Sequence, residues 1–260
     1  MVASNDQTLE QLKTAYPGLQ RSLDVYYGDS ERDAAMDTLY RRFVSSGMLA
    51  FDIGSHVGDR IGSFLRLGAR VVALEPQPDC AAVIRGLYGA AGRNVLLEEA
   101  ACGDIAGVLK LRVNSKNPTV TTASAGFVAA ADGAKGWEGQ EWDQEIEVPS
   151  VTLDQLIARH GVPDFAKIDV EGFEDNVLAG LTRPLGALSF EFTTIEREVA
   201  YRCLERLATL GPYRFDIALG ESHKLTFGDG HEIDAAQMAA HIRALPHDAN
   251  SGDVYAVREA

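Results

Sequence analysis

Several features of extracellular and membrane proteins are missing from this sequence. It has only three cysteines, Cys80, Cys102 and Cys203, which are widely spaced and predict neither a disulfide framework nor a metal site. The longest run of apolar and glycine residues, AGFVAAA at 125–131, is far shorter than the ~20 residues that span a bilayer. The N-terminal stretch, MVASNDQTLE, has no basic region and no apolar core, so we expect no signal peptide. These absences predict a cytoplasmic protein that does not bind membranes.

Positive charge is also scarce. The chain has 24 Lys and Arg against 38 Asp and Glu, and its formal net charge is −14. Phosphate groups would repel such a chain, so we expect no nucleic-acid partner. Its 260 residues, 46% of them hydrophobic, are enough for one well-buried domain with or without an extra lobe. We find no internal repeat and no second core.

The beginning of the chain predicts helices. Residues 30–46, SERDAAMDTLYRRFVSS, place apolar side chains at helical spacing behind a plausible cap, Ser30. We therefore expect residues 1–47 to form an N-terminal helical extension that packs on a main domain at 48–260.

From residue 48 onward, short apolar runs alternate with helical patterns. Strands are predicted at 48–54, 70–76, 94–103, 164–172, 187–192, 213–219, 224–227 and 253–259. Helices are predicted at 59–68, 78–92, 148–161, 174–181 and 196–210, the third with a capping box of Thr152 and Gln155. Most of these runs are apolar throughout, which is typical of strands buried on both faces of a parallel sheet. The alternation predicts a doubly wound α/β domain.

Residues 114–145 do not fit this alternation. They are rich in Gly, Ala, Ser and Thr and contain both tryptophans, Trp137 and Trp142. A loop of this length inside a compact domain is usually functional or disordered. We expect a substrate-side insertion here, with the two indole rings stacked on a sugar or other ring. The alternative is a mobile loop whose two tryptophans pack on the sheet.

The turn after the first predicted strand, FDIGSHVGDR at 51–60, is the candidate ligand site. In a doubly wound sheet a nucleotide-like ligand sits at the first strand-to-helix turn. Gly54 and Gly58 lack Cβ atoms, so the backbone can approach a ligand closely. Asp52 can accept a hydrogen bond, and Glu75, which ends the next predicted strand, can accept bonds from both ribose hydroxyls.

The spacing of this turn bears on which cofactor it holds. Pyrophosphate cofactors typically require G-x-G-x-x-G, whereas this turn reads D-x-G-x-x-x-G. S-adenosylmethionine has no phosphates, and its sulfonium and ammonium groups suit the negative charge of Asp52, Asp169 and Glu171. A nicotinamide-dependent oxidoreductase is an alternative, although no tyrosine is followed by a lysine four residues later, as a short-chain dehydrogenase dyad requires. A non-catalytic nucleoside-binding scaffold is another alternative.

Taken together, these motifs resemble the FkbM-type family of S-adenosylmethionine-dependent methyltransferases. FDIGSHVGDR is similar to that family's glycine motif, ALEPQPD to its second-strand acid motif, and EEAACGDIAGVLKL to its third strand and following hairpin. VPSVTLDQLI and DFAKIDVEGFEDNVLAGL match its most specific block, I-D-V-E-G-x-E. The resemblance covers about residues 48–195. One departure is His56, where the family commonly has Asn.

The resemblance implies a class I methyltransferase fold, which is α/β and doubly wound, with a mostly parallel seven-stranded sheet. It also implies methylation of a hydroxyl on a sugar or secondary metabolite. The cofactor-binding residues are expected to be Asp52, Gly54, Ser55, Gly58, Glu75, Pro76, Gln77, Ala101 and Asp169. No metal is expected, although Asp169 with Glu191 is an alternative site for Mg²⁺.

Methyl transfer to a hydroxyl needs aligned reactants and a general base, because an alcohol is a poor nucleophile until its proton leaves. The candidate catalytic residues are Asp169, Glu171, His56 and Glu191, with His223 as a further candidate base. Each has a structural alternative: Asp169 and Glu171 could cap the helix that follows, Glu191 could be solvated, and His56 could only hydrogen-bond within the turn.

The acceptor is expected to be a small molecule or a glycan, bound by Trp137, Trp142 and His223. His223 lies near His231 and Glu232, so a metal cluster is the alternative to a polar hairpin tip there. A homo-oligomer is compatible with the sequence.

Overall fold

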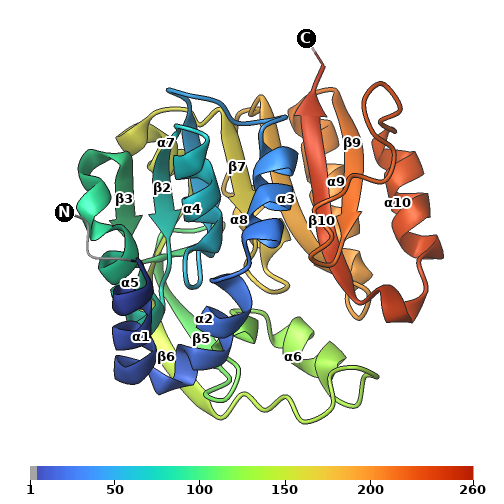
Figure 1. The fold of residues 1–260 in the computed structure, drawn as a ribbon. Coiled ribbons are helices and arrows are strands. Elements are labelled where there is room, and N and C mark those ends of the chain that lie inside the picture. The colour runs from blue at the N-terminus through green and yellow to red at the C-terminus, as the bar shows by residue number, and fades with distance from the viewer. Residues whose placement is uncertain (1–4, 260) are drawn as a thin grey trace.

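A seven-stranded sheet forms the centre of the computed structural model, which describes residues 5–259 (Figure 1). The strand order is β3-β2-β1-β7-β8-β10-β9, and the first five strands are parallel. β10 lies antiparallel between β8 and β9. The bounds are β1 (Leu49–Ile53), β2 (Arg70–Leu74), β3 (Val95–Glu98), β7 (Phe165–Ile168), β8 (Ala187–Thr193), β9 (Tyr213–Leu219) and β10 (Ser251–Arg258). The predicted doubly wound, mostly parallel, seven-stranded sheet is confirmed.

Apolar layers cover both faces of the sheet, which explains why the strands lack an alternating pattern. In β1, Phe51 and Ile53 belong to one buried cluster and Ala50 to the other. The first face is packed by α7 (Leu153–His160), α8 (Glu174–Ala179), α9 (Arg197–Leu210) and α10 (Ala235–Ala244). The second is packed by α3 (Ser30–Tyr40), α4 (Asp59–Arg66) and α5 (Pro78–Tyr88). Figure 1 shows α3 and α4 in front of the sheet and α8 and α9 behind it.

A small second sheet lies beyond the carboxyl ends of β1, β2 and β7. Its order is β4-β6-β5, formed by β4 (Ala101–Cys102), β5 (Gly107–Val113) and β6 (Gln144–Val151). The predicted strand at 94–103 is therefore two strands, β3 and β4. Sequence reasoning missed β6. Helix α7 begins at Leu153 and not at the predicted residue 148. The predicted capping box of Thr152 and Gln155 at its start is confirmed. Between β5 and β6 the chain forms η3 (Pro118–Val120) and α6 (Ala125–Ala131).

The N-terminal segment is helical, as predicted. It forms α1 (Asn5–Ala15), η1 (Pro17–Leu19), α2 (Gln20–Tyr26) and α3. The cap of α3 is Asp29, whose side chain accepts from the amides of Glu31 and Arg32, and the helix ends at Tyr40 rather than at residue 46. Residues 1–4, part of the stretch used to predict that a signal peptide is absent, lie outside the described residues. No helix within residues 5–259 is long and apolar enough to cross a membrane.

The predicted strand at 224–227 is wrong, because this segment is a loop pinned to β9. The buried carboxylate of Asp216 accepts hydrogen bonds from the amides of Ile217, Phe227 and Gly228 at 2.7, 2.9 and 2.8 Å. These bonds, together with the amide of Thr226 donating to the carbonyl of Ile217 at 2.9 Å, hold the segment against β9 as a loop without a strand ladder. Helix α10 follows, and sequence reasoning also missed it and the short turn η4 (His247–Ala249).

Asp216→Ala should lower the free energy of unfolding by about 2–4 kcal/mol, because it leaves buried amide groups without acceptors. Asp229→Ala is the matched control in the same loop. Its carboxylate is largely exposed and pairs with Arg42 at the surface, so we expect a change within about 0.5 kcal/mol. Urea unfolding measures both. Equal losses in the two variants would contradict the anchoring role of Asp216.

Candidate functional site

A cavity lies at the carboxyl edge of β1, β2 and β7, between the main sheet and the small sheet. It encloses about 900 Å³ including the solvent at its mouth. The strand order reverses beside β1, and such a switch point is where ligands bind in open α/β sheets. The sequence-predicted residues that line the cavity are Gly54, Ser55, His56, Glu75, Pro76, Gln77, Ala101, Asp169 and Glu171. The predicted residues Asp52, Gly58, Trp137, Trp142, Glu191 and His223 do not line it.

The glycine turn is held tightly against its neighbours. Gly54 has φ +83°, and a Cβ built there would lie 1.8 Å from the carbonyl oxygen of Asp169. The turns after β1 and β7 therefore touch backbone to backbone, which only glycine permits. Gly58, with φ +86°, precedes α4, and a Cβ there would lie 2.9 Å from the ring of Tyr88.

Glu75 is placed to bind a ribose. It is 2% exposed, and its two carboxylate oxygens accept from the backbone amides of His56 at 2.7 Å and Gln77 at 2.8 Å. Each oxygen retains room for one more donor, so two ribose hydroxyls fit. Burial raises the pKa of Glu75 to about 8, while the two amide bonds oppose that shift.

A buried negative charge lies beneath the turn. Asp52 is 1% exposed, and neither carboxylate oxygen has a hydrogen-bond partner among residues 5–259. Burial raises the pKa of Asp52 to about 6, against the attraction of Lys167. An unpartnered carboxylate next to the turn suits a ligand with a positively charged end, so the residues present fit S-adenosylmethionine.

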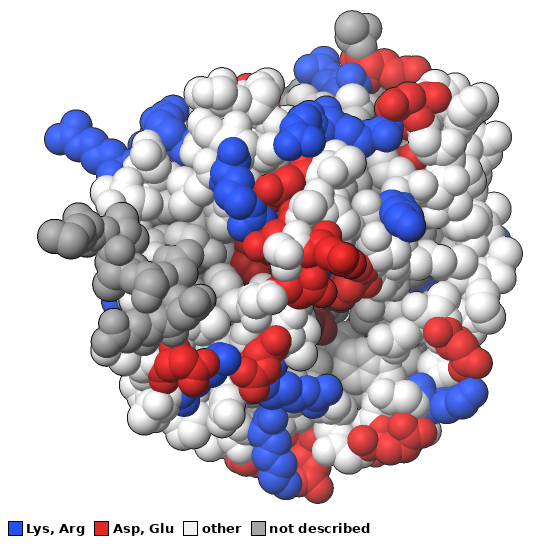
Figure 2. Space-filling view, viewed as in Figure 1, with Lys and Arg blue, Asp and Glu red and all other residues white. Residues whose placement is uncertain are grey.

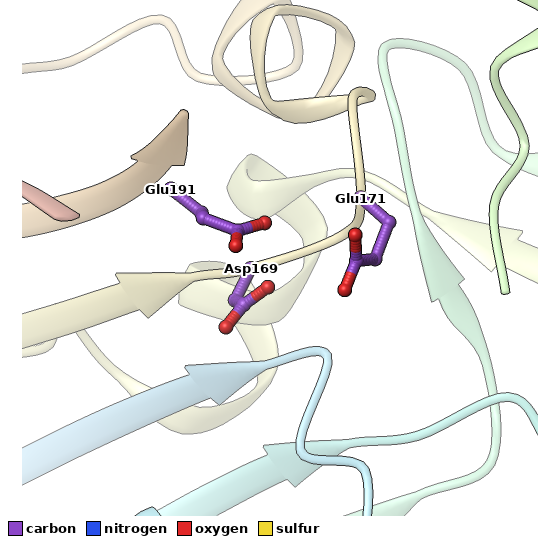
Figure 3. A group of neighbouring side chains, drawn as sticks. All are labelled: Asp169, Glu171 and Glu191. Atoms are coloured by element: carbon purple, nitrogen blue, oxygen red, sulfur yellow. The ribbon is translucent and has the colours of Figure 1, made fainter. Parts of the chain in front are cut away.

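Three carboxylates converge at the mouth of the cavity. Asp169 follows β7, Glu171 lies in the turn after it, and Glu191 projects from β8 (Figure 3). One oxygen of each lies within 4.8 Å of the others. The ammonium of Lys167, itself 2% exposed, contacts Asp169 Oδ2 at 2.5 Å and lies 3.8 Å from Asp253 Oδ1.

These carboxyl groups differ in basicity. Burial acts to raise the pKa of Asp169, but the neighbouring Lys167 outweighs it and holds that pKa below its ordinary value. Burial and repulsion from Asp169 raise the pKa of Glu171 and of Glu191 well above theirs. The group has the spacing to hold a divalent cation, although Lys167 already occupies one oxygen of Asp169. The expectation that no metal is needed stays a prediction.

Glu174, which sequence reasoning did not assign, shapes the turn that carries Glu171. It is 1% exposed and accepts from the amides of Val170 at 2.8 Å and Gly172 at 3.3 Å. Helix α8 has no side-chain cap, so Asp169 and Glu171 do not cap it. Both carboxylates are therefore left to face the cavity.

His56 connects the turn to its surroundings. Its Nε2 lies 2.8 Å from the hydroxyl of Ser22 in α2 and 3.3 Å from that of Thr119 in η3, and its Nδ1 lies 3.6 Å from Cys80 Sγ. Burial lowers the pKa of His56 to about 4, so the ring is neutral at neutral pH. These contacts favour a role in holding the cavity wall over the predicted role as a base.

The two tryptophans pack against Phe127 of α6 within the insertion, and not on the sheet, which was the alternative to acceptor binding. The ring centroid of Trp137 lies 5.1 Å from that of Phe127, and the indole N–H of Trp137 donates a hydrogen bond to Asn250 Oδ1. The ring centroid of Trp142 lies 6.1 Å from that of Phe127, and its indole N–H donates to the carbonyl of Val120. Neither ring reaches the cavity wall, so acceptor stacking by them stays a prediction without support from the geometry.

The His223 side chain is buried beside Glu221 rather than in the cavity wall. Burial lowers the pKa of His223 to about 4. Within residues 5–259, only the Asp169 group brings three possible metal ligands together. The alternative metal cluster of His223, His231 and Glu232 is therefore not formed.

Sequence reasoning missed an ion cluster, three of whose four members line the cavity. We call Arg32, Asp59, Arg60 and Glu221 the Arg32 cluster. Arg32 Nη2 contacts Asp59 at 2.8 Å and Glu221 at 2.7 Å, while Arg60 contacts Asp59 at 2.5 Å and Glu221 at 3.2 Å. Figure 2 shows acidic side chains gathered over the lower end of α3, beside a hollow in this face. The only sequence signal is the Asp-Arg pair directly after Gly58.

The topology, the glycine turn and the buried Glu75 at the end of β2 are typical of a class I S-adenosylmethionine-dependent methyltransferase. A family model described as the methyltransferase FkbM domain matches residues 52–217, more than half of the chain. The chain belongs to the FkbM methyltransferase family. The alternatives of a nicotinamide oxidoreductase and of a non-catalytic scaffold are thereby set aside.

Solved structures with a similar fold include other methyltransferases. An O-methyltransferase from Bacillus cereus in complex with SAH is 14% identical, with a TM-score of 0.48 over 100% of this chain and 93% of that chain. Precorrin-6y C5,15-methyltransferase from Geobacter metallireducens is also 14% identical, with a TM-score of 0.46 over 88% and 90%. These distant likenesses carry no argument about the acceptor. No curated protein matches the sequence.

Glu75→Gln should weaken binding of S-adenosylhomocysteine about tenfold or more, because the ribose loses charge-assisted hydrogen bonds. Glu98→Gln is the matched control, since Glu98 ends the adjacent strand but pairs with Arg159 and His160 outside the cavity. Isothermal titration calorimetry measures both. An unchanged affinity in Glu75→Gln would refute the assignment of Glu75 to the ribose.

The free energy of unfolding of the ligand-free protein should fall as pH rises from 6.5 to 8. Folding raises the pKa of Glu75 and of Glu174 to about 8, so their stabilising protonation is lost as pH rises through that value. His56 and His223, whose pKa values are lowered by folding, change the free energy of unfolding only below about pH 6.5, so they do not contribute over this interval. Urea unfolding at several pH values tests this, and Glu75→Gln should show a shallower fall than Glu98→Gln. A rise in stability over this interval would contradict it.

Proposed function

We propose that the protein transfers the methyl group of S-adenosylmethionine to a hydroxyl of a neutral small molecule or glycan. The observation that carries the proposal is Glu171, a carboxylate in the cavity wall whose pKa is raised well above its ordinary value. An acceptor hydroxyl must lose its proton as its oxygen bonds to the methyl carbon and the carbon–sulfur bond breaks. A carboxylate of raised basicity is suited to take that proton.

Asp169 and Lys167 support this step from the adjacent strand end. Lys167 favours the ionised form of Asp169 and fixes one of its oxygens at 2.5 Å. The other oxygen of Asp169 is then available to accept a hydrogen bond from the acceptor hydroxyl and to orient it. Glu191 does not line the cavity, but one of its carboxylate oxygens lies within 4.8 Å of oxygens of Asp169 and Glu171, and burial and their negative charges raise its pKa.

The charges of the cavity wall favour a neutral acceptor over a phosphorylated one. Its two cationic side chains, among the residues described, are already paired: Arg60 with Asp59 and Glu221, and Lys167 with Asp169. Glu171 has no ion-pair partner among residues 5–259. A phosphate would therefore meet unopposed negative charge, whereas hydroxyl groups can donate to the carboxylates.

Glu171→Gln should reduce methyl transfer about 100-fold or more while leaving binding of S-adenosylhomocysteine within about twofold. Wild-type turnover should rise with pH through the raised pKa of Glu171, because only the ionised form accepts a proton, and the variant should lose this dependence. The assay measures S-adenosylhomocysteine release with a panel of neutral sugars and phenols. Glu198→Gln, on the exposed side of α9, is the control.

The result is informative in either direction. Full activity in Glu171→Gln together with loss of activity in Glu191→Gln would move the general base to Glu191. Methylation of amines but of no hydroxyl compound in the panel would overturn the proposed acceptor class.

A further inference from the structure

The turn that carries Glu171 has a strained backbone. Glu171 has φ +56°, in the left-handed region that residues with a Cβ rarely adopt. Such a conformation persists only where neighbouring contacts fix it, and it is common at functional sites. Here it places the carboxylate beside Asp169 and Glu191, with one oxygen of each within 4.8 Å of the others (Figure 3). The contacts that hold this backbone therefore decide where the carboxylate lies.

The peptide unit between Glu171 and Gly172 is held at both of its polar atoms. Its N–H donates to the buried carboxylate of Glu174 at 3.3 Å. Its carbonyl oxygen accepts a hydrogen bond from Thr122 Oγ1 at 2.6 Å, which comes from the insertion at 114–145. Glu171 can leave its left-handed conformation only if this peptide unit rotates, and such a rotation would break both bonds.

Thr122 is fixed by its own contacts. It is 1% exposed, and its backbone N–H and carbonyl both pair with Arg112 of β5, at 3.0 and 2.8 Å. Its hydroxyl oxygen also accepts from the amide of Ser124 at 2.8 Å. Thr122 does not line the cavity. The hydroxyl therefore links the small sheet to the Glu171 turn and acts on the cavity only through that turn.

Phe127 of α6 supports the same turn by an apolar contact. A Cβ built on Gly172, which has φ +84°, would lie 2.8 Å from the side chain of Phe127, so the turn packs directly against the phenyl ring. Phe127 is fully buried, and the rings of Trp137 and Trp142 pack on it. The apolar interior of the insertion thus supports the turn that Thr122 fixes by a hydrogen bond.

We propose that Thr122 is a positioning residue, which holds Glu171 in its left-handed conformation and keeps the carboxylate of Glu171 directed into the cavity. The proposal rests on the proposed function, in which Glu171 is the general base. Thr122 touches no reacting atom, and it acts through the carbonyl of Glu171. The insertion therefore contributes to catalysis by placing the base.

The first test needs no acceptor. Thr122→Val removes the hydroxyl and nearly keeps the shape of the side chain, and Thr122→Ser restores the hydroxyl. Thr194→Val is the matched control, because the buried hydroxyl of Thr194 donates to the carbonyl of His247 at 2.8 Å, outside the cavity wall. Carbon-13 NMR of protein labelled at the glutamate carboxyl carbons measures the pKa of Glu171. Its signal is assigned by its absence in Glu171→Gln.

The charged groups that face Glu171 are the same in all of these variants, namely Lys167, Asp169, Glu174 and Glu191. Loss of the Thr122 bond frees the turn, so water reaches the carboxylate and the effect of burial on its pKa decreases. We expect the pKa of Glu171 to fall by about 1 or more in Thr122→Val and to stay within about 0.3 of the wild-type value in Thr122→Ser and Thr194→Val.

An unchanged pKa of Glu171 in Thr122→Val would overturn the proposal, as would an equal fall in Thr194→Val. Thermal unfolding confirms that each variant is folded. If Thr122→Val does not fold, Thr122→Ala replaces it, because the smaller side chain leaves room for a water molecule to pair with the amide of Ser124. The same fall in pKa is expected in Thr122→Ala, and the same outcomes would contradict it.

Turnover with the panel of neutral sugars and phenols gives a second readout. Thr122→Val should lower kcat about tenfold and leave binding of S-adenosylhomocysteine within about twofold, because only the base is displaced. In the Glu171→Gln background the same substitution should change the residual rate less than about twofold, because there is no base left to position. A further tenfold loss in that background would show a general structural role and overturn the proposal.

The two readouts separate this inference from the proposed function. A lowered pKa of Glu171 in Thr122→Val, together with full activity in Glu171→Gln, would refute Glu171 as the base and still support the hold of Thr122 on its turn. An unchanged pKa, together with loss of activity in Glu171→Gln, would leave the base in place and overturn the role of Thr122.

Discussion

The buried ammonium of Lys167 is the interaction on which the rest of the site depends. It lies between Asp169, which follows the same strand, and Asp253 on β10, and its charge also acts on Asp52 in β1. Without a cation here, carboxylates from three strands would repel one another at the edge of the sheet, in surroundings where water screens charge poorly. Lys167 thus allows a sheet edge to concentrate the negative charge that a cationic cofactor requires.

The parts of the site that are local in sequence could be predicted from the sequence. Gly54, Glu75 and Asp169 each follow a buried strand, and the parallel arrangement brings such strand ends together, so motif and position suffice to place them. The apolar runs likewise identified the strands of the main sheet. The predicted strand at 224–227 failed because contacts with β9, among them the carboxylate of Asp216 and the carbonyl of Ile217, hold this segment as a loop.

The remainder depends on contacts between residues far apart in the chain. Tyr26 and Glu221 reach the cavity from opposite ends of the sequence. Arg32 meets the Asp59–Arg60 pair and the distant Glu221 only in the folded protein. Strand β6 was hidden because it begins within a segment rich in small and polar residues and pairs antiparallel with β5, outside the main alternation. Predicting these features requires the tertiary fold, because only the fold specifies which surfaces meet.

The antiparallel position of β10 has a consequence for how the protein is made. β9 leaves the ribosome before β10, yet β10 lies between β8 and β9 and makes the hydrogen bonds to both. A nascent chain that ends within α10 therefore leaves β8 with an unpaired edge and β9 with no strand to join. Open strand edges are templates for pairing with other chains. Late in synthesis, this protein thus passes through a stage at which its central sheet needs shielding from its neighbours.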